Sequence, residues 1–263
     1  MLSVLLRQFA HWKPHKHSKK LRYNSQLNLK KPIPLPPRHD FIDFKKYTGN
    51  EILFALKDSQ ELRATELSNA LLQLGVRKGA PENIDWNVHP TVSIAIETAK
   101  KRIPQCPMKV LTSLALACSR LGISDPQLWE LLEKHIVRTM PSMEPIGIAY
   151  CFSSFVGKGT QEFYQELLSK INIHVNYLNG RDLLNVVKGC VHEDLEAKEL
   201  FEKKLYPLIL QKKKMCTPDQ LNEFIELLGK RSDCSEETLQ SLKEAREYKL
   251  ERRKTLSFGG VLK

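Results

Sequence analysis

The stretch "LALACSRLG", from Leu114 to Gly122, decides the fold of this chain. Its apolar and small residues are Leu114, Ala117, Cys118 and Leu121, at positions i, i+3, i+4 and i+7. That spacing is the apolar stripe of an amphipathic helix, and the glycine that follows stands where helices commonly end. A half-buried strand would place an apolar residue at every second position, so the stretch predicts a helix.

The same spacing recurs at four other places along the chain. The copies are "LSNALLQLG" from Leu67, "AYCFSSFVG" from Ala149, "LLNVVKGCV" from Leu183 and "LNEFIELLG" from Leu221. Consecutive copies begin 47, 35, 34 and 38 residues apart. Self-similarity with a period of roughly 20 to 50 residues is typical of helical-repeat proteins, in which each unit buries its apolar face against its neighbours.

A second helix is predicted after each copy. These helices lie within residues 89–103, 125–140, 160–175, 195–210 and 235–254. Asp125 followed by Pro126 indicates the start of a helix. Thr217, Pro218 and Gln220 predict a capping box with proline at the first helical position. The prolines expected to interrupt or kink helices are Pro141, Pro145 and Pro207.

No stretch of the chain predicts a run of alternating strands. The sequence therefore predicts an all-α fold, a right-handed α-solenoid of about five helix pairs with an extended basic N-terminal arm. We expect the arm to occupy residues 1–39, the helical repeats residues 40–254, and a C-terminal tail residues 255–263.

The composition, with 41% hydrophobic and 27% charged residues, is ordinary for a folded protein. Uncharged stretches such as residues 145–157 are shorter than the roughly 20 residues that span a bilayer, so an integral membrane protein is not expected. The six cysteines contain no C-x-x-C pair, which favours reduced structural thiols over a disulfide framework or a zinc site. They are Cys106, Cys118, Cys151, Cys190, Cys216 and Cys234.

The net charge of +11 is concentrated in the arm. Residues 1–39 hold nine Lys and Arg and no Asp or Glu. The remaining residues hold 32 basic and 30 acidic groups, which leaves them close to neutral. The chain is therefore a nearly neutral helical body that carries a polycationic N-terminus, and such a segment favours polyanionic partners.

Residues 1–13, "MLSVLLRQFAHWK", form a short amphipathic start without acidic residues. The side chains available for one apolar face are Leu2, Leu5, Leu6, Phe9 and Trp12. This composition is typical of a mitochondrial transit peptide, so we expect localisation in the mitochondrial matrix. The apolar core is too short for a good secretory signal. The alternative is a solvated basic tail outside mitochondria.

The rest of the arm is predicted to bind RNA. Its dense cations neutralise phosphates, and the interleaved Trp12 and Tyr23 provide rings for base stacking. The candidate RNA-binding residues are Lys13, Lys16, Lys19, Lys20, Arg22, Lys30, Lys31 and Arg38. His11, His15 and His17 have no accompanying carboxylate or thiol, which favours polycation character over a metal site.

The arm continues into a proline-rich segment, "KKPIPLPPRHD". Its prolines favour an extended, semi-rigid spacer, with an adaptor-domain ligand of the P-x-x-P type as the alternative. Whether the helical body adds to the RNA site stays open. The body cations that would have to converge are Lys100, Lys101, Arg102, Arg120, Lys188, Lys230 and Arg231.

No catalytic residue, metal ligand or cofactor is predicted. The stretch "GKGT" from Gly157 lacks the upstream glycine of a P-loop and is expected to be a turn between helices. His192 and Glu193 lack the second histidine of a helical zinc-hydrolase motif. Most acidic residues are interleaved with lysines, as on solvated helix faces.

"LSNALLQLG" and "LTSLALACSRLGISDPQLWELLEKHI" resemble the octotricopeptide and heptatricopeptide repeats of organellar proteins. They are also similar to the repeats of the Fas-activated serine/threonine kinase-like family, although no RAP domain is evident. The resemblance covers roughly residues 50–250. It implies action on organellar RNA, and the missing RAP domain favours a short architectural member over a nuclease.

The sequence therefore predicts a non-catalytic mitochondrial protein that associates with RNA. The most concrete form is a structural component of the mitochondrial ribosome, with ribosomal or other mitochondrial RNA and neighbouring proteins as partners. One alternative is a structural accessory subunit of a respiratory or ATP-synthase complex, with the arm held by protein or anionic lipid. Another is a cytosolic adaptor solenoid.

Overall fold

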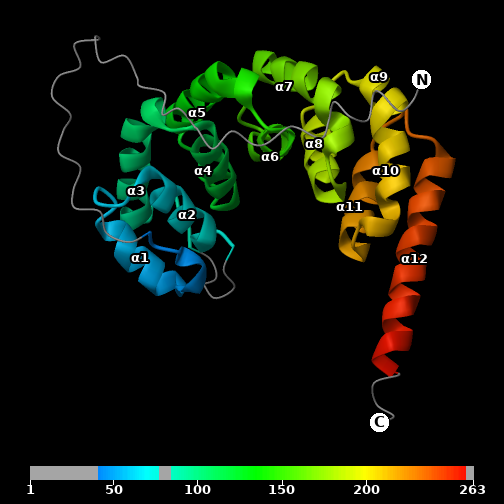
Figure 1. The fold of residues 1–263 in the computed structure, drawn as a ribbon, viewed down its shortest axis with the longest axis horizontal. Helices are drawn as coiled ribbons and strands as arrows, with labels where there is room; N and C mark the ends of the chain where they lie inside the picture. Colours follow the sequence, from blue (N-terminus) through cyan, green and yellow to red (C-terminus); the bar gives the residue numbers. More distant parts are fainter. Residues whose placement is uncertain (1–40, 77–83, 259–263) are drawn as a thin grey trace, which may run out of the picture. The chain divides into compact units, whose positions relative to one another are not determined.

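The computed structural model describes residues 41–76 and 84–258. Within these ranges the chain forms helices and turns without a strand, which confirms the predicted all-α class (Figure 1). The eight candidate RNA-binding cations and the predicted leader lie outside the described residues. Their expected roles therefore stay predictions.

Each copy of the repeated stripe begins on one helix, and the copy from Ala149 runs past the end of its helix at Ser154. We call these five the stripe helices: α2 (Ala64–Leu74), α4 (Met108–Arg120), α6 (Pro145–Ser154), α8 (Gly180–His192) and α11 (Pro218–Leu228). They pack in succession, α2 on α4, α4 on α6, α6 on α8 and α8 on α11 (Figure 1). Their inward residues belong to one continuous apolar core, in which Leu71 and Leu114 are buried as expected.

The intervening helices cover the stripe helices on one side. They are α1 (Gly49–Lys57), α3 (Pro90–Arg102), α5 (Pro126–Thr139), α7 (Gln161–His174), the α9 (Lys198–Leu200) to α10 (Tyr206–Lys212) segment, and α12 (Glu236–Phe258). The contacts run from α1 to α3, from α3 to α5 and from α5 to α7. A short 3₁₀ turn, η2 (Phe44–Lys46), precedes α1. Four others follow helices directly: η3 (Ile103–Gln105), η4 (Met140–Ser142), η5 (Val175–Tyr177) and η7 (Lys213–Met215).

The predicted helix-start signals are present. Asp125 accepts a hydrogen bond from the N–H of Leu128 at 3.1 Å and caps α5. Thr217 and Gln220 form the reciprocal capping box that begins α11, with bonds of 2.9 and 3.2 Å. Helix α1 was not predicted, although Thr48 caps it, because it carries no copy of the stripe.

The prolines interrupt helices as expected. Pro141 lies in the 3₁₀ turn that follows α5, and Pro145 is the first residue of α6. Pro207 follows a π-helical segment, η6 (Phe201–Leu205), which lies between α9 and α10. A proline has no N–H to donate to the carbonyl four residues earlier, so a widened turn at this position relieves the broken pattern.

The register predicted for the copy on α8 is wrong by three residues. At the end of α4 the N–H of Ile123 donates to the carbonyl of Cys118 at 2.9 Å. At the end of α8 the N–H of Leu195 donates to the carbonyl of Cys190, also at 2.9 Å. Cys190 therefore corresponds to Cys118, whereas the sequence alignment matched it to Leu121. A stripe at i, i+3, i+4 and i+7 nearly superposes on itself after a shift of three, which explains the error.

The glycines that follow the stripes have two different roles. Gly122 and Gly157 have φ angles of 67° and 69°, in the left-handed region that glycine reaches without strain. Gly75 and Gly229 have φ angles of −74° and −64°, which any residue adopts. Gly75 instead permits close packing, because a Cβ there would lie 3.1 Å from the Cβ of Arg120.

Candidate nucleic-acid interface

The body cations singled out in the sequence do not form one surface. Lys188 pairs with Glu223 at 3.2 Å. Arg102 donates to backbone carbonyls in the turn after α1, at Gln60 and Leu62. Arg231 pairs with Asp233 at 2.7 Å and lies 3.8 Å above the centre of the Phe201 ring. These side chains hold the helices together, and we assign them no ligand.

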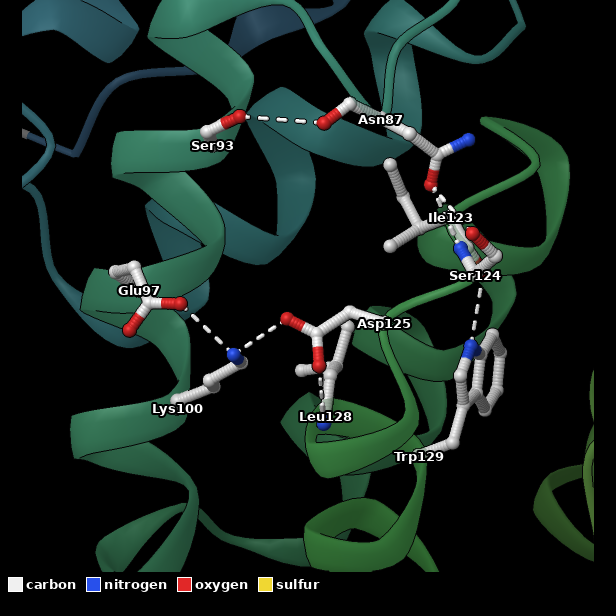
Figure 2. A network of polar contacts seen from close by, with 9 residues as sticks. All are labelled: Asn87, Ser93, Glu97, Lys100, Ile123, Ser124, Asp125, Leu128 and Trp129. Atoms are coloured by element: carbon white, nitrogen blue, oxygen red, sulfur yellow. Dashed lines mark hydrogen bonds and ion pairs between the residues drawn. The ribbon is translucent and has the colours of Figure 1, made fainter.

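Lys100 belongs to a polar network between α3 and the turn that joins α4 to α5 (Figure 2). Its ammonium group contacts Glu97 at 2.8 Å and also Asp125, the residue that caps α5. Asn87 accepts a hydrogen bond from the N–H of Ser124 at 2.8 Å. The charged groups drawn in Figure 2 find their partners inside the network, so it is structural.

Arg120 has a different environment. It lies in a groove of about 900 Å³ that we call the α4 groove. The groove is lined by Lys45, Leu72, Gln73, Gly75, Val76, Lys109, Thr112, Ser113, Leu116, Arg120, Tyr150 and Arg181. Four of these residues are cations and none is Asp or Glu. The surface is therefore positively charged, with hydroxyl and amide groups between the charges.

The α4 groove follows directly from the helix periodicity of α4. Lys109, Ser113, Leu116 and Arg120 stand at i, i+4, i+7 and i+11, a second stripe beside the buried one. The neighbouring helices α6 and α8 contribute Tyr150 and Arg181. The cations thus come from separate elements and meet because the stripe helices pack in succession.

The two arginines of the α4 groove form no ion pair in the described part of the chain, although the charge of Arg181 acts on the buried carboxylate of Asp182 beside it. Neither guanidinium donates a hydrogen bond or forms an ion pair with a described residue. Burial and then the charge of Arg181 lower the pKa of the Arg120 guanidinium. The repulsion between Arg120 and Arg181 disfavours the folded chain, and a bound anion would relieve it.

A second basic groove, of about 820 Å³, lies at the other end of the described chain; we call it the C-terminal groove. It is lined by Lys213, Lys214, Met215, Cys216, Thr217, Pro218, Ser241, Glu244, Ala245, Tyr248, Lys249, Arg252 and Arg253. Five of these residues are cations and one, Glu244, is acidic. Met215 is 81% exposed and Tyr248 64% exposed, so the C-terminal groove offers apolar surface as well as charge.

The cysteines occupy structural positions. Burial raises the pKa of the Cys118, Cys151 and Cys190 thiols to about 12, which keeps them protonated and unreactive at neutral pH. No group of three or more His, Cys, Asp or Glu residues gathers at metal-binding distance within residues 41–76 and 84–258. None of the helices in those ranges combines the length and apolar composition that crossing a membrane requires.

The stretch from Gly157 to Thr160 is the turn between α6 and α7, as expected. Thr160 caps α7 by accepting a hydrogen bond from the N–H of Phe163 at 3.2 Å. Glu193 accepts a hydrogen bond from the N–H of Gly157 and so joins the end of α8 to that turn. Both sequences that were compared with catalytic motifs therefore have packing roles.

No family model and no curated protein matches the chain. The function is therefore inferred from the chain's own residues. Of the body cations considered in the sequence, Arg120 is in the α4 groove, and Lys45, Lys109 and Arg181 were missed. The spacing of Lys109 and Arg120 on one helix face was visible in the sequence, whereas the approach of Arg181 depends on helix packing.

Proposed function

We propose that this protein is a non-catalytic helical-repeat protein of the mitochondrial matrix that associates with RNA, as a structural component of the mitochondrial ribosome. The observation that carries the proposal is the α4 groove, in which Arg120 and Arg181 lie without an acidic neighbour in the lining. Phosphodiesters supply the missing negative charge and accept several hydrogen bonds from a guanidinium group.

The succession of stripe helices supports a right-handed α-solenoid of about five helix pairs. In such an array a ligand bound along the stripe helices contacts several repeats. The α4 groove has this property, because its lining comes from α2, α4, α6 and α8. Single-stranded RNA is extended and charged at every nucleotide, so it suits a groove that crosses repeats.

In this proposal the arm and the α4 groove have different tasks. The arm supplies most of the sequence-independent affinity, because its nine cations have no acidic residue to compensate them. The α4 groove supplies a fixed pair of guanidinium groups that orients the RNA on the helical body. The predicted leader and the resemblance to organellar repeat families favour mitochondrial RNA as the ligand.

The test is a titration of fluorescent single-stranded RNA against the full chain and against residues 40–263 over a salt series. Each phosphate neutralised on a single strand contributes about −0.7 to the salt slope, so six engaged cations give roughly −4. We expect the full chain to show that slope and the truncated chain to bind more weakly with a shallower one. Equal affinity and slope would assign the RNA site to the repeats alone.

The compartment has its own test. Residues 1–39 fused to a fluorescent reporter are expected to direct it into mitochondria. Replacing Leu5, Leu6 and Phe9 by serine removes the apolar face and keeps the charge, and should leave the reporter in the cytosol. A cytosolic distribution of the unmodified fusion would contradict the assignment.

A second candidate function is a structural accessory subunit of a respiratory or ATP-synthase complex. The observation that favours it is the exposed apolar surface of Met215 and Tyr248 in the C-terminal groove. Failure of both the full and the truncated chain to bind RNA would favour this candidate, with the arm held by protein or anionic lipid.

A further inference from the structure

The C-terminal groove has a regular geometry. Its α12 wall is formed by Ser241, Glu244, Ala245, Tyr248, Lys249 and Arg252, at i, i+3, i+4, i+7, i+8 and i+11. The opposite wall is the short turn η7 together with the start of α11. The groove therefore runs lengthwise along α12, and it is long enough to hold an extended or helical segment rather than a single small molecule.

The apolar part of the C-terminal groove is exposed to solvent. Met215 and Tyr248 are 81% and 64% exposed, and Pro218 and Ala245 line the same surface. Methionine has an unbranched, polarizable side chain that adapts to different apolar partners. Tyrosine combines a large apolar ring with a hydroxyl group, and it is enriched in protein interfaces.

The C-terminal groove is lined by cations as well as by apolar side chains. Lys213 donates to the hydroxyl of Ser241, and Lys249 donates to the carbonyl of Lys214 at 2.9 Å. These two bonds are to neutral oxygen atoms, so they do not neutralise the charges of Lys213 and Lys249. Five cations against the single acid Glu244 give the lining a net positive charge.

These features favour one kind of occupant. The chain's own N-terminal arm carries nine cations and no acid, so charge repulsion disfavours it. RNA would meet Glu244 in the lining and would find one aromatic ring among aliphatic and thioether groups, whereas single strands bind best along several rings. An amphipathic segment with acidic flanks complements both the apolar and the basic side chains of the lining.

We infer that the C-terminal groove is a docking site for an acidic amphipathic segment of a partner protein. Apolar side chains of that segment cover Met215 and Tyr248. Its carboxylates lie against the lysines and arginines that line the groove. The protein then joins RNA, bound by the arm and the α4 groove, to a second protein bound at its C-terminal end.

Methyl NMR of the full chain, labelled on its methionine methyl groups, tests this inference at the residue concerned. The probe is a synthetic helical peptide of about 15 residues with leucines on one face and glutamates elsewhere. The comparison peptide has the same leucines, with lysines in place of the glutamates. We expect the acidic peptide to shift the Met215 methyl signal, whereas the basic peptide leaves it in place. The buried Met140 and Met143 serve as internal references.

Substitutions in the C-terminal groove test whether the acidic peptide binds there. The double substitution Met215→Ser and Tyr248→Ser is expected to weaken the acidic peptide about tenfold, because truncated apolar anchors cost the most binding energy. The matched control is Tyr177→Ser, which removes another exposed tyrosine, 77% exposed, on η5. The control should bind the acidic peptide as the unmodified chain does.

Three results would overturn the inference. One is no shift of the Met215 signal with the acidic peptide at concentrations up to about 1 mM, the weak limit for such complexes. Another is equal weakening by Tyr177→Ser. The third is a Met215 shift of the same size with oligouridine, which would make the C-terminal groove a second RNA site. The RNA proposal is tested independently, by the RNA titrations of the unmodified chain.

Discussion

The two grooves are similar in size, about 900 and 820 Å³, and both are lined by cations, yet they differ in everything else that selects a ligand. The α4 groove has no acid in its lining and brings together one arginine from α4 and one from α8. The C-terminal groove includes Glu244 and exposes Met215 and Tyr248. Positive charge alone therefore does not identify an RNA site. The acidic and apolar side chains beside the cations influence whether a groove favours a phosphate or an acidic peptide.

The largest expected effect comes from Leu114→Asp. Leu114 is 3% exposed and lies in α4 between α2 and α6. An unpaired carboxylate there should lower the free energy of unfolding by about 3–5 kcal/mol and disrupt the α4 groove. Urea unfolding followed by circular dichroism measures the loss. Leu250→Asp on α12, where the side chain is 40% exposed, is the control and should change stability little.

Gly189→Ala is expected to affect ligand binding at the α4 groove and not at the C-terminal groove. A Cβ at Gly189 would lie 2.5 Å from the backbone oxygen of Phe152, so α6 and α8 must move apart. Overpacking of this kind costs about 1–3 kcal/mol, and it shifts Tyr150 on α6 relative to Arg181 on α8 within the lining of the α4 groove. We expect weaker RNA binding and unchanged binding of the acidic peptide at the C-terminal groove. Loss of peptide binding to the same extent as RNA binding would contradict the independence of the two grooves.

Among these substitutions, charge reversal in the C-terminal groove is expected to change RNA affinity the least. Lys214→Glu with Arg253→Glu should weaken the acidic peptide about tenfold, since two attractive contacts become repulsive. RNA affinity should fall by less than about threefold. Salt screens the interaction between these charges and RNA bound elsewhere on the protein. Lys101→Glu with Lys230→Glu is the control pair, and the readout is fluorescence anisotropy of both labelled ligands.

Much of the fold was predictable because the stripe is a local pattern with the period of a helix. The copies on α2 and α4 were placed correctly down to their buried residues. The register on α8 was not, because Asp194 stands at the left-handed position that Gly122 holds after α4. Helix α1 has no stripe, and the π-helical segment before Pro207 depends on how that proline is accommodated.

The candidate sites were harder to predict than the helices. Lys109 and Arg120 share a face of α4, and the sequence contains that information. Arg181 comes from a different repeat and reaches the same groove only through the packing of α4, α6 and α8. Lys100 is an error in the opposite direction. The sequence suggested that it could bind RNA, but its ammonium group forms ion pairs with Glu97 and Asp125.

The most direct test of the central claim is the salt dependence of RNA binding by the full chain with Arg120→Ala and Arg181→Ala. Loss of two phosphate contacts should make the salt slope shallower by about 1.4 and weaken binding about tenfold at low salt. Lys101→Ala with Lys230→Ala removes two exposed cations outside the α4 groove and should leave slope and affinity unchanged. If both pairs behave alike, or if the arginine pair binds RNA as the unmodified chain does, the α4 groove is not an RNA site.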